Sequence, residues 1–218
     1  MKVGIDGVLL GAWAATEDCD STLDIGTGTG LIALMLAQRS ISTVDAIDID
    51  ENAVLQAKEN VENSPWKDRI QVRKISLQEL TKVCSKQYDL IVSNPPYFVN
   101  CTKTPLANRT AARHTDSLSH EELILHSKQL LKPTGKICII LPVIEGFQCI
   151  EHALEMDLFC KKQVIVYPKP NAVAKRLLLE FSLSPALKTN SELIIESEER
   201  HHYSPDFSTL AKDFYLKL

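Results

Sequence analysis

The chain has 218 residues, of which 44% are hydrophobic and 24% are charged, and this balance excludes an intrinsically disordered protein. No apolar run reaches the roughly 18 residues of a membrane-spanning helix, and the first residues lack the apolar stretch of a signal peptide. The formal net charge of −4 is unfavourable for a nucleic-acid partner without excluding one, because four glutamates concentrate negative charge in one late segment: Glu192, Glu196, Glu198 and Glu199.

The six cysteines show no Cys-x-x-Cys spacing, which predicts reduced thiols in a cytoplasmic protein and no zinc site. The adjacent His201 and His202 have no Cys or acid at metal-ligand spacing, so we expect no metal there. Because the sequence shows no repeat, low-complexity tract or linker, we expect residues 1–218 to form one domain, with a monomer favoured.

Short β-rich runs alternate with helical runs from Ser21 to about Leu141. The expected strands cover residues 23–25, 44–47, 70–75, 88–92 and 136–141. The expected helices cover residues 31–38, 51–62 after an Asp50 N-cap, 119–131 after a Ser-x-x-Glu capping box, and 146–158. Strands that alternate with helices predict an α/β fold, in which helices cover both faces of a parallel sheet.

Apolar residues recur at helical spacing in two of these helices: Val54, Ala57 and Val61 in the first, and Ile150, Leu154 and Leu158 in the second. Farther along, the β-rich runs 163–167 and 177–183 flank a loop with Pro168 and Pro170. This arrangement favours a pair of antiparallel strands over another strand–helix–strand unit.

A glycine-rich segment, Asp24-Ile25-Gly26-Thr27-Gly28-Thr29-Gly30, follows the first expected strand and precedes a helix. Glycines let the backbone approach a ligand closely and adopt positive φ values, and the helix that follows directs free N–H groups toward the same place. In an open α/β sheet a nucleotide-like ligand binds at this point. A plain tight turn is the alternative, and Asp24 could serve simply as a turn residue.

Asp48 stands at the end of the second expected strand, where an acid can accept both ribose hydroxyl protons. The glycine spacing is Gly-x-Gly-x-Gly, which differs from the dinucleotide fingerprint Gly-x-Gly-x-x-Gly. A dinucleotide places its pyrophosphate at the N-terminus of the helix, whereas S-adenosylmethionine has no pyrophosphate. Loop and acid together therefore predict an adenosine-type cofactor.

The most specific motif is Asn94-Pro95-Pro96-Tyr97, directly after the strand at 88–92. Two prolines cannot extend a strand, so they force a rigid turn at the sheet edge that also carries the glycine loop. An adenine amine is a poor nucleophile, because its lone pair is delocalised into the ring. Two hydrogen-bond acceptors held at such a corner could direct that lone pair toward a methyl donor. The Asn94 side-chain oxygen and the Pro95 carbonyl could accept the two amine protons, and Tyr97 could stack on the base. The alternative is a turn with a packed aromatic beneath it.

These motifs resemble the amino-methyltransferases of the Rossmann-like, S-adenosylmethionine-dependent class, and most closely the bacterial tRNA1(Val) adenine-N6-methyltransferases. The resemblance runs along nearly the whole chain, including the opening VGIDGVLLGAW and the closing KDFYLKL. It implies a central, mostly parallel seven-stranded sheet with one antiparallel strand, and methylation of the adenine 3′ of the anticodon in tRNA1(Val). The methyl donor would be S-adenosylmethionine, with S-adenosylhomocysteine as product.

Carried over by position, the family's roles imply two groups of site residues. The catalytic residues would be Asn94, Pro95, Pro96 and Tyr97. The cofactor would be bound by Asp24, Gly26, Thr27, Gly28, Gly30, Asp48, Ile49, Ser76, Leu77 and Asn94. The chain departs from the family pattern in three places. Ser76 replaces the acid that often follows the third strand, Ile5 replaces the Thr before Asp6, and the family's usual short basic and aromatic stretch is absent before Lys2.

Basic residues suggest two places where RNA could bind. The loop after the diproline corner carries Lys103, Arg109, Arg113 and His114, and we predict that these residues contact phosphates near the target nucleotide. A merely solvated loop is the alternative. A second set, whose role is left open, lies around the expected antiparallel strands: Lys161, Lys162, Lys169, Lys175 and Arg176.

Other functions compete with this interpretation. A protein glutamine N5-methyltransferase uses the same tetrapeptide but usually has an added helical domain, and a guanine-N2 enzyme acting on rRNA more often ends the motif in Phe. An NAD oxidoreductase would leave the diproline motif unexplained. A catalytically silent RNA-binding module would leave the glycine loop without a purpose.

Overall fold

The structure is a computed structural model, which describes residues 4–96, 118–185, 187–198 and 202–215. Its centre is an eight-stranded sheet with the order β3-β2-β1-β4-β5-β7-β6-β8. The strands are β1 (Ser21–Ile25), β2 (Thr43–Asp48), β3 (Ile70–Lys74), β4 (Tyr88–Ser93), β5 (Leu131–Pro142), β6 (Phe159–Tyr167), β7 (Arg176–Ser182) and β8 (Thr189–Ile194). Only β7 runs antiparallel to its neighbours, which confirms the mostly parallel sheet and the expected antiparallel pairing of β6 with β7.

The expected count of seven strands is wrong, because β8 adds an eighth strand that pairs in parallel with β6. Most of β8 is exposed at the edge of the sheet, and its sequence TNSELI is largely polar. An edge strand with little buried surface needs no apolar alternation, so the sequence gives no strand signal there.

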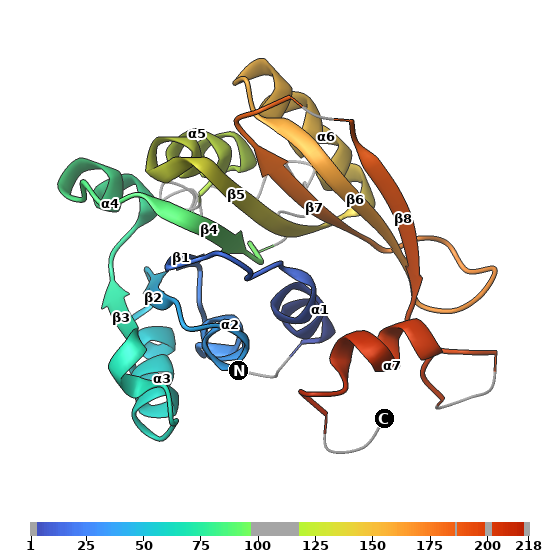
Figure 1. The fold of residues 1–218 in the computed structure, drawn as a ribbon, viewed down its shortest axis with the longest axis horizontal. Coiled ribbons are helices and arrows are strands. Elements are labelled where there is room, and N and C mark those ends of the chain that lie inside the picture. Colours follow the sequence, from blue (N-terminus) through green and yellow to red (C-terminus); the bar gives the residue numbers. More distant parts are fainter. Residues whose placement is uncertain (1–3, 97–117, 186, 199–201, 216–218) are drawn as a thin grey trace, which may run out of the picture.

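Helices cover both faces of the sheet, as expected (Figure 1). They are α1 (Ile5–Trp13), α2 (Leu31–Arg39), α3 (Glu51–Glu62), α4 (Leu77–Val83), α5 (His120–Leu130), α6 (Val143–Glu155) and α7 (Pro205–Ala211), with a 3-10 turn at Lys67–Arg69. In Figure 1, α5 and α6 lie above the sheet, whereas α1, α2 and α7 lie below it. Each layer forms its own apolar core against the sheet.

The capping residues expected from the sequence lie at the N-termini of α3 and α5. The Asp50 side chain accepts hydrogen bonds from the backbone N–H groups of Asn52 and Ala53, at 2.7 and 3.2 Å. Ser119 and Glu122 form the reciprocal capping box at the start of α5. The expected stripe of Val54, Ala57 and Val61 is buried.

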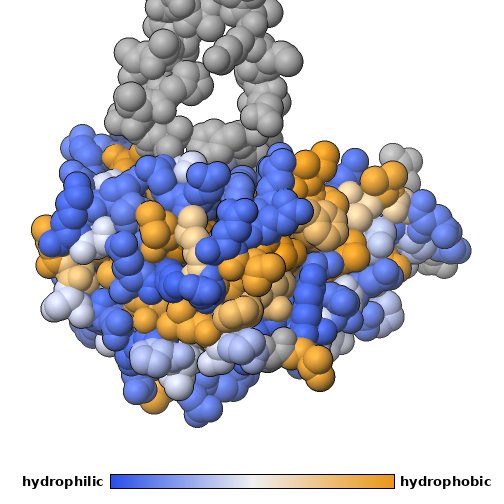
Figure 2. Space-filling model, turned by 90° about the horizontal axis from the view of Figure 1, so that it is seen from above, coloured by the Kyte–Doolittle hydropathy of each residue, from blue (hydrophilic) through white to orange (hydrophobic). Residues whose placement is uncertain are grey.

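The stripe expected on α6 is wrong at Leu154, which is 60% exposed. The helix begins three residues earlier than predicted and buries Gly146, Cys149 and Ala153 instead. Gly146 allows this close contact, since a Cβ there would lie 2.8 Å from the Leu177 side chain. Together with Ile144 and Phe147, Leu154 adds exposed apolar surface to α6, and Figure 2 shows apolar residues on the face seen from above.

β5 begins at Leu131, directly after α5, although the sequence predicted the strand only from residue 136. Gly135 makes this early pairing with β4 possible. A Cβ at Gly135 would lie 2.8 Å from the carbonyl oxygen of Tyr88. We therefore expect Gly135→Ala to lower the free energy of unfolding by about 1–3 kcal/mol, because the backbone of β4 must shift.

Urea denaturation of the two proteins measures this change. Gly4→Ala is the matched control, since nothing lies within 4 Å of a Cβ at that position. The control should change the free energy by less than about 0.5 kcal/mol. Equal effects of the two substitutions would contradict the steric explanation.

Candidate active site

The carboxyl ends of β1, β2, β3 and β4 meet at one edge of the sheet, because these strands are parallel. Ile25 at the end of β1 is in register with Ser93 at the end of β4. The buried Ser93 hydroxyl donates a hydrogen bond to the Ile25 carbonyl oxygen at 3.0 Å. The glycine loop and the diproline corner therefore start from adjacent, tied strand ends.

The glycine loop has the backbone conformation that its sequence predicts. Gly26, Gly28 and Gly30 have φ values of +70°, +58° and +81°, which L residues rarely adopt. A Cβ at Gly30 would lie 3.4 Å from the Cβ of Ala57 in α3, so Gly30 packs against that helix. At Gly26 nothing lies within 4 Å of the Cβ position, and the open space belongs to a cavity.

Asp24 supports the loop from below. It is fully buried, and its Oδ2 accepts hydrogen bonds from the Thr27 hydroxyl at 2.6 Å and from the Ala33 N–H at 3.2 Å. Its Oδ1 is buried without a hydrogen-bond partner among the described residues. Burial raises the pKa of Asp24 to about 7, although the hydrogen bonds from Thr27 and Ala33 oppose the rise.

This raised pKa predicts how stability depends on pH. Because the carboxyl group holds its proton more tightly when folded, it costs no stability well below its unfolded pKa of about 3.8. The cost grows as the pH rises toward about 7 and is constant above it. Asp24→Asn removes the titration, so the variant should gain about 2–3 kcal/mol relative to the wild type between pH 5 and pH 8.

Urea unfolding of both proteins at pH 5, 6, 7 and 8, without ligand, measures that difference. Groups that titrate in both proteins cancel in the comparison. A difference in unfolding free energy that stays constant over this range would show that Asp24 does not titrate there.

Asp48 connects the glycine loop to α3. Its Oδ2 accepts a hydrogen bond from the Gly28 N–H and its Oδ1 accepts one from the Asp50 N–H, both at 2.9 Å. The N–H groups of Gly26 and Thr27 donate to the Ile47 carbonyl oxygen, which folds the loop over the end of β2. Each carboxylate oxygen keeps a further lone pair, so Asp48 can still accept hydroxyl protons from a ribose.

These strand ends enclose a cavity of about 570 Å³. It is lined by Ile25, Gly26, Gly28, Ile47, Asp48, Ile49, Asp50, Ala53, Ile75, Ser76, Leu77, Gln78, Ser93, Asn94, Pro95, Pro96 and Leu118. Most of these side chains are apolar, with a few convergent polar groups, which is typical of a cofactor site. The open space at Gly26 and the accepting oxygens of Asp48 fit S-adenosylmethionine.

The structure brings most of the predicted site residues together at this cavity. Gly26, Gly28, Asp48, Ile49, Ser76, Leu77 and Asn94 line it, together with Pro95 and Pro96. Asp24, Thr27 and Gly30 do not belong to the lining and instead hold the loop in shape. Tyr97 and the predicted RNA contacts Lys103, Arg109, Arg113 and His114 lie outside the described residues.

Several residues of the wall, among them Ile75, Gln78 and Leu118, were not predicted from the sequence, whereas Ser76 and Leu77 at the start of α4 were. Ser76 caps this helix. Its hydroxyl accepts a hydrogen bond from the Glu79 N–H at 3.2 Å and donates one to Glu79 Oε2 at 2.9 Å. The Ser-x-x-Glu pattern of residues 76–79 is a capping-box signal that could have located this helix.

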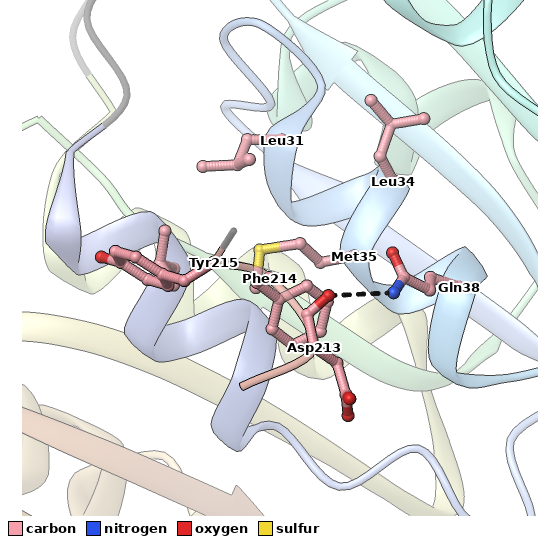
Figure 3. Close-up of a pocket in the computed structure, with 8 residues that line it drawn as sticks. Leu31, Leu34, Met35, Gln38, Asp213, Phe214 and Tyr215 are labelled. Carbon is pink, nitrogen blue, oxygen red and sulfur yellow. Dashed lines mark hydrogen bonds between the residues drawn. The ribbon is translucent and has the colours of Figure 1, made fainter. Parts of the chain in front are cut away.

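A second cavity, of about 620 Å³, lies between the first two helices and residues 213–215 (Figure 3). It is lined by Val8, Leu31, Leu34, Met35, Gln38, Asp213, Phe214 and Tyr215. Gln38 donates a hydrogen bond to the Asp213 carbonyl oxygen across it, and the lining is otherwise mostly apolar. This cavity contains no residue of the glycine loop or the diproline corner, so we do not assign the chemistry to it.

The second basic set does not form one cluster. β6 separates it, with Lys161 and Lys162 near its start and Lys169, Lys175 and Arg176 beyond its end. Acids neutralise three of the five, since Lys162 pairs with Glu180 at 3.2 Å, Lys169 with Glu196 at 3.1 Å and Arg176 with Asp6 at 2.9 Å. These pairings weaken the case for a phosphate-binding surface there.

Three further expectations from the sequence concern metal ligands, cysteines and membrane-spanning helices. The described part of the chain contains no cluster of His, Cys, Asp and Glu that could hold a metal ion. Cys19, Cys84, Cys138, Cys149 and Cys160 are free thiols. None of the helices in the described ranges combines the length and hydropathy needed to span a bilayer.

The family described as "Methyltransferase small domain" matches residues 8–167 of this chain. The tRNA1(Val) (adenine(37)-N6)-methyltransferase of Parabacteroides distasonis is 52% identical over 100% of this chain and 92% of its own length. The enzyme of the same name from Trichodesmium erythraeum is 48% identical with the same coverage. The chain belongs to this methyltransferase family.

A solved structure agrees with the fold of this tRNA1(Val) (adenine(37)-N6)-methyltransferase family member. A protein of Agrobacterium tumefaciens described as a predicted O-methyltransferase superposes with a TM-score of 0.74 over 95% of each chain, at 18% identity. Such low identity shows the fold alone, which is the Rossmann-like class I methyltransferase fold. Family and fold together make the chain an S-adenosylmethionine-dependent methyltransferase.

Proposed function

We propose that this enzyme transfers a methyl group from S-adenosylmethionine to the N6 amine of an adenine in tRNA. The specific target is the adenine 3′ of the anticodon in tRNA1(Val), and the enzyme acts in the cytoplasm. The observation that carries the proposal is that Asn94, Pro95 and Pro96 line the same cavity as the glycine loop and Asp48. The names of the relatives at 52% and 48% identity support the adenine and the tRNA.

The cofactor side of the site uses the chain's own hydrogen-bonding groups. Asp48 accepts the ribose hydroxyl protons, and the exposed side chain of Ile49 packs against the adenine ring. Gly26 and Gly28 allow the methionine end to approach the backbone closely, and Asp24, Thr27 and Gly30 keep their loop in this conformation. When bound, S-adenosylmethionine supplies a methyl group that is already activated on a sulfonium.

The substrate side positions the nucleophile. The side-chain oxygen of Asn94 and the carbonyl oxygen of Pro95 accept the two protons of the adenine amine, which directs its lone pair toward the cofactor. Tyr97 stacks on the base, and the basic residues that follow contact phosphates. No general base is required before attack, because the proton leaves after the methyl group has been transferred.

The alternative functions considered from the sequence are less well supported than adenine methylation. The glutamine and guanine-N2 enzymes share the tetrapeptide, but both relatives act on adenine according to their names. A silent RNA-binding module has no use for an open cavity beside Gly26 and Asp48. The glycine spacing disfavours NAD.

The decisive experiment incubates the purified protein with S-adenosylmethionine and tRNA from a strain that lacks the gene. Nucleoside mass spectrometry should then show N6-methyladenosine at the position next to the anticodon of tRNA1(Val). Methylation of a different tRNA would refute the substrate but keep the reaction. Absence of methyladenosine in every RNA fraction, from a protein that is folded and binds the cofactor, would refute the proposal.

A further inference from the structure

α6 begins at the same edge of the sheet as the diproline corner. β4 and β5 are parallel neighbours, and Ser93 at the end of β4 is in register with Ile139. β5 continues past this level to Pro142, and α6 begins at the next residue, Val143. The first turn of α6 therefore stands beyond the end of β4, on the side of the sheet where the diproline corner lines the cavity.

The first turn of α6 also projects past the neighbouring helix, α5. The two helices run in the same direction, because α5 ends where β5 begins and α6 begins where β5 ends. His152 Nε2 in the third turn of α6 lies 3.4 Å from Glu121 Oε1 in the first turn of α5. Consequently the start of α6 reaches farther toward the site edge than the start of α5 does.

Two large apolar side chains are exposed at this end of α6. Ile144 is 71% exposed and Phe147 is 47% exposed, whereas Gly146 is buried against the sheet. Residues three apart are neighbours on a helix surface, so Ile144 and Phe147 share one face. Helical side chains lean toward the N-terminus of their helix, which here is the site edge of the sheet. The two side chains therefore form an apolar platform beside the mouth of the site.

The charges around this platform suit a nucleic acid. Burial lowers the pKa of His120 at the start of α5, and the nearby Glu145 carboxylate opposes this shift, so the acid of the first turn lies toward α5. Arg176 in β7 is in register with Pro142, which places the exposed Lys175 near the start of α6. A cation close to an aromatic ring matches a ligand that combines phosphates with unstacked bases.

We propose that Phe147, with Ile144 beside it, stacks on an unpaired base of the tRNA anticodon loop other than the target adenine. This inference rests on the proposed function, which brings an anticodon loop to the diproline corner. Such a loop presents unpaired bases, and proteins bind these bases by stacking them on aromatic side chains. Phe147 does not line the cofactor cavity. It therefore contributes to the affinity for RNA and not to the chemical step.

Fluorescence anisotropy with a labelled anticodon stem-loop of tRNA1(Val) measures this contribution. Phe147→Ala should raise the dissociation constant of the RNA about tenfold, which is typical of the loss of one stacked base. Phe147→Trp should bind within about threefold of the wild type. The affinity for S-adenosylhomocysteine and the rate of methyl transfer at saturating RNA should change less than twofold in both variants.

Leu154→Ala is the matched control. Leu154 is also apolar and exposed on α6, but it lies two turns farther from the site edge, and the exposed Glu151 separates it from Phe147. This variant should bind the stem-loop like the wild type.

Stem-loops that lack one loop base at a time identify the stacked base. Removal of that base should weaken binding to the wild type, and Phe147→Ala should then cause no further loss. Wild-type affinity of Phe147→Ala would overturn the inference, as would a loss that is equal for every loop or is shared by Leu154→Ala. A wild-type dimer that Phe147→Ala separates in sedimentation velocity would show that a second copy covers the platform and would also overturn it. A wild type that binds S-adenosylhomocysteine but methylates no adenine in tRNA would instead refute the proposed function.

Discussion

Asn94→Ala is expected to lower kcat for tRNA methylation by about 10²–10³-fold, because it removes one preorganised acceptor for the adenine amine. The dissociation constant of S-adenosylhomocysteine should change far less, since the glycine loop and Asp48 remain. Asn94→Asp keeps a side-chain oxygen at the same place and should retain more activity than the alanine variant. Single-turnover transfer from labelled cofactor to purified tRNA separates these cases.

Asn190→Ala provides the control for this prediction, because Asn190 is exposed on the edge strand β8. It should methylate tRNA at the wild-type rate. If Asn94→Ala also retained the full single-turnover rate, the amide oxygen would play no part in the chemistry, whatever the substrate.

Asp48→Ala is expected to weaken S-adenosylhomocysteine binding by about 10²-fold. The substitution removes a charged acceptor of hydrogen bonds that the ribose hydroxyls donate, each of which contributes about 1.5–3 kcal/mol. It also releases the N–H groups of Gly28 and Asp50, which now bond to the carboxylate at 2.9 Å. The loop therefore loses its preorganised conformation along with its ligand contact.

Isothermal titration measures this loss, and Asp68→Ala in the exposed 3-10 turn is the matched control. The control should bind like the wild type. A dissociation constant for folded Asp48→Ala within threefold of the wild type would mean that the ribose lies elsewhere.

The arrangement of the site followed from local patterns, because parallel strands bring their carboxyl ends to one edge. Gly26, Asp48 and Asn94 each follow an apolar run that forms a buried strand, so their meeting at one cavity was predictable without any long-range contact. The positive φ values of the glycines likewise follow from residue type.

Features that depend on packing were not predictable in the same way. Whether Asp24 lines the cavity or supports the loop depends on the side to which its carboxylate points. Every residue of β1 is buried, so an alternation of polar and apolar residues does not predict that side. The polar sequence of β8 does not indicate a strand. The segment is a strand in the structure because its backbone pairs with β6. The basic residues in β6 and beyond its end formed a cluster in the sequence, but three of them pair with acids that are distant in the chain.

Ser76 shows how one pattern can obscure another. Its position after the third strand suggested a cofactor contact, whereas its spacing from Glu79 makes it a helix cap. The same residue therefore lines the cavity while its hydroxyl is engaged elsewhere. The neighbouring Gln78 also lines the cavity, although it belongs to no motif of its own.

The most direct test of the central claim is a crystal structure with S-adenosylhomocysteine and an anticodon stem-loop of tRNA1(Val). The target amine should lie about 2.7–3.2 Å from both the Asn94 side-chain oxygen and the Pro95 carbonyl oxygen, with the cofactor sulfur on its open side above Gly26. A target adenine bound away from this corner, or a cofactor whose sulfur faces away from the amine, would contradict the account.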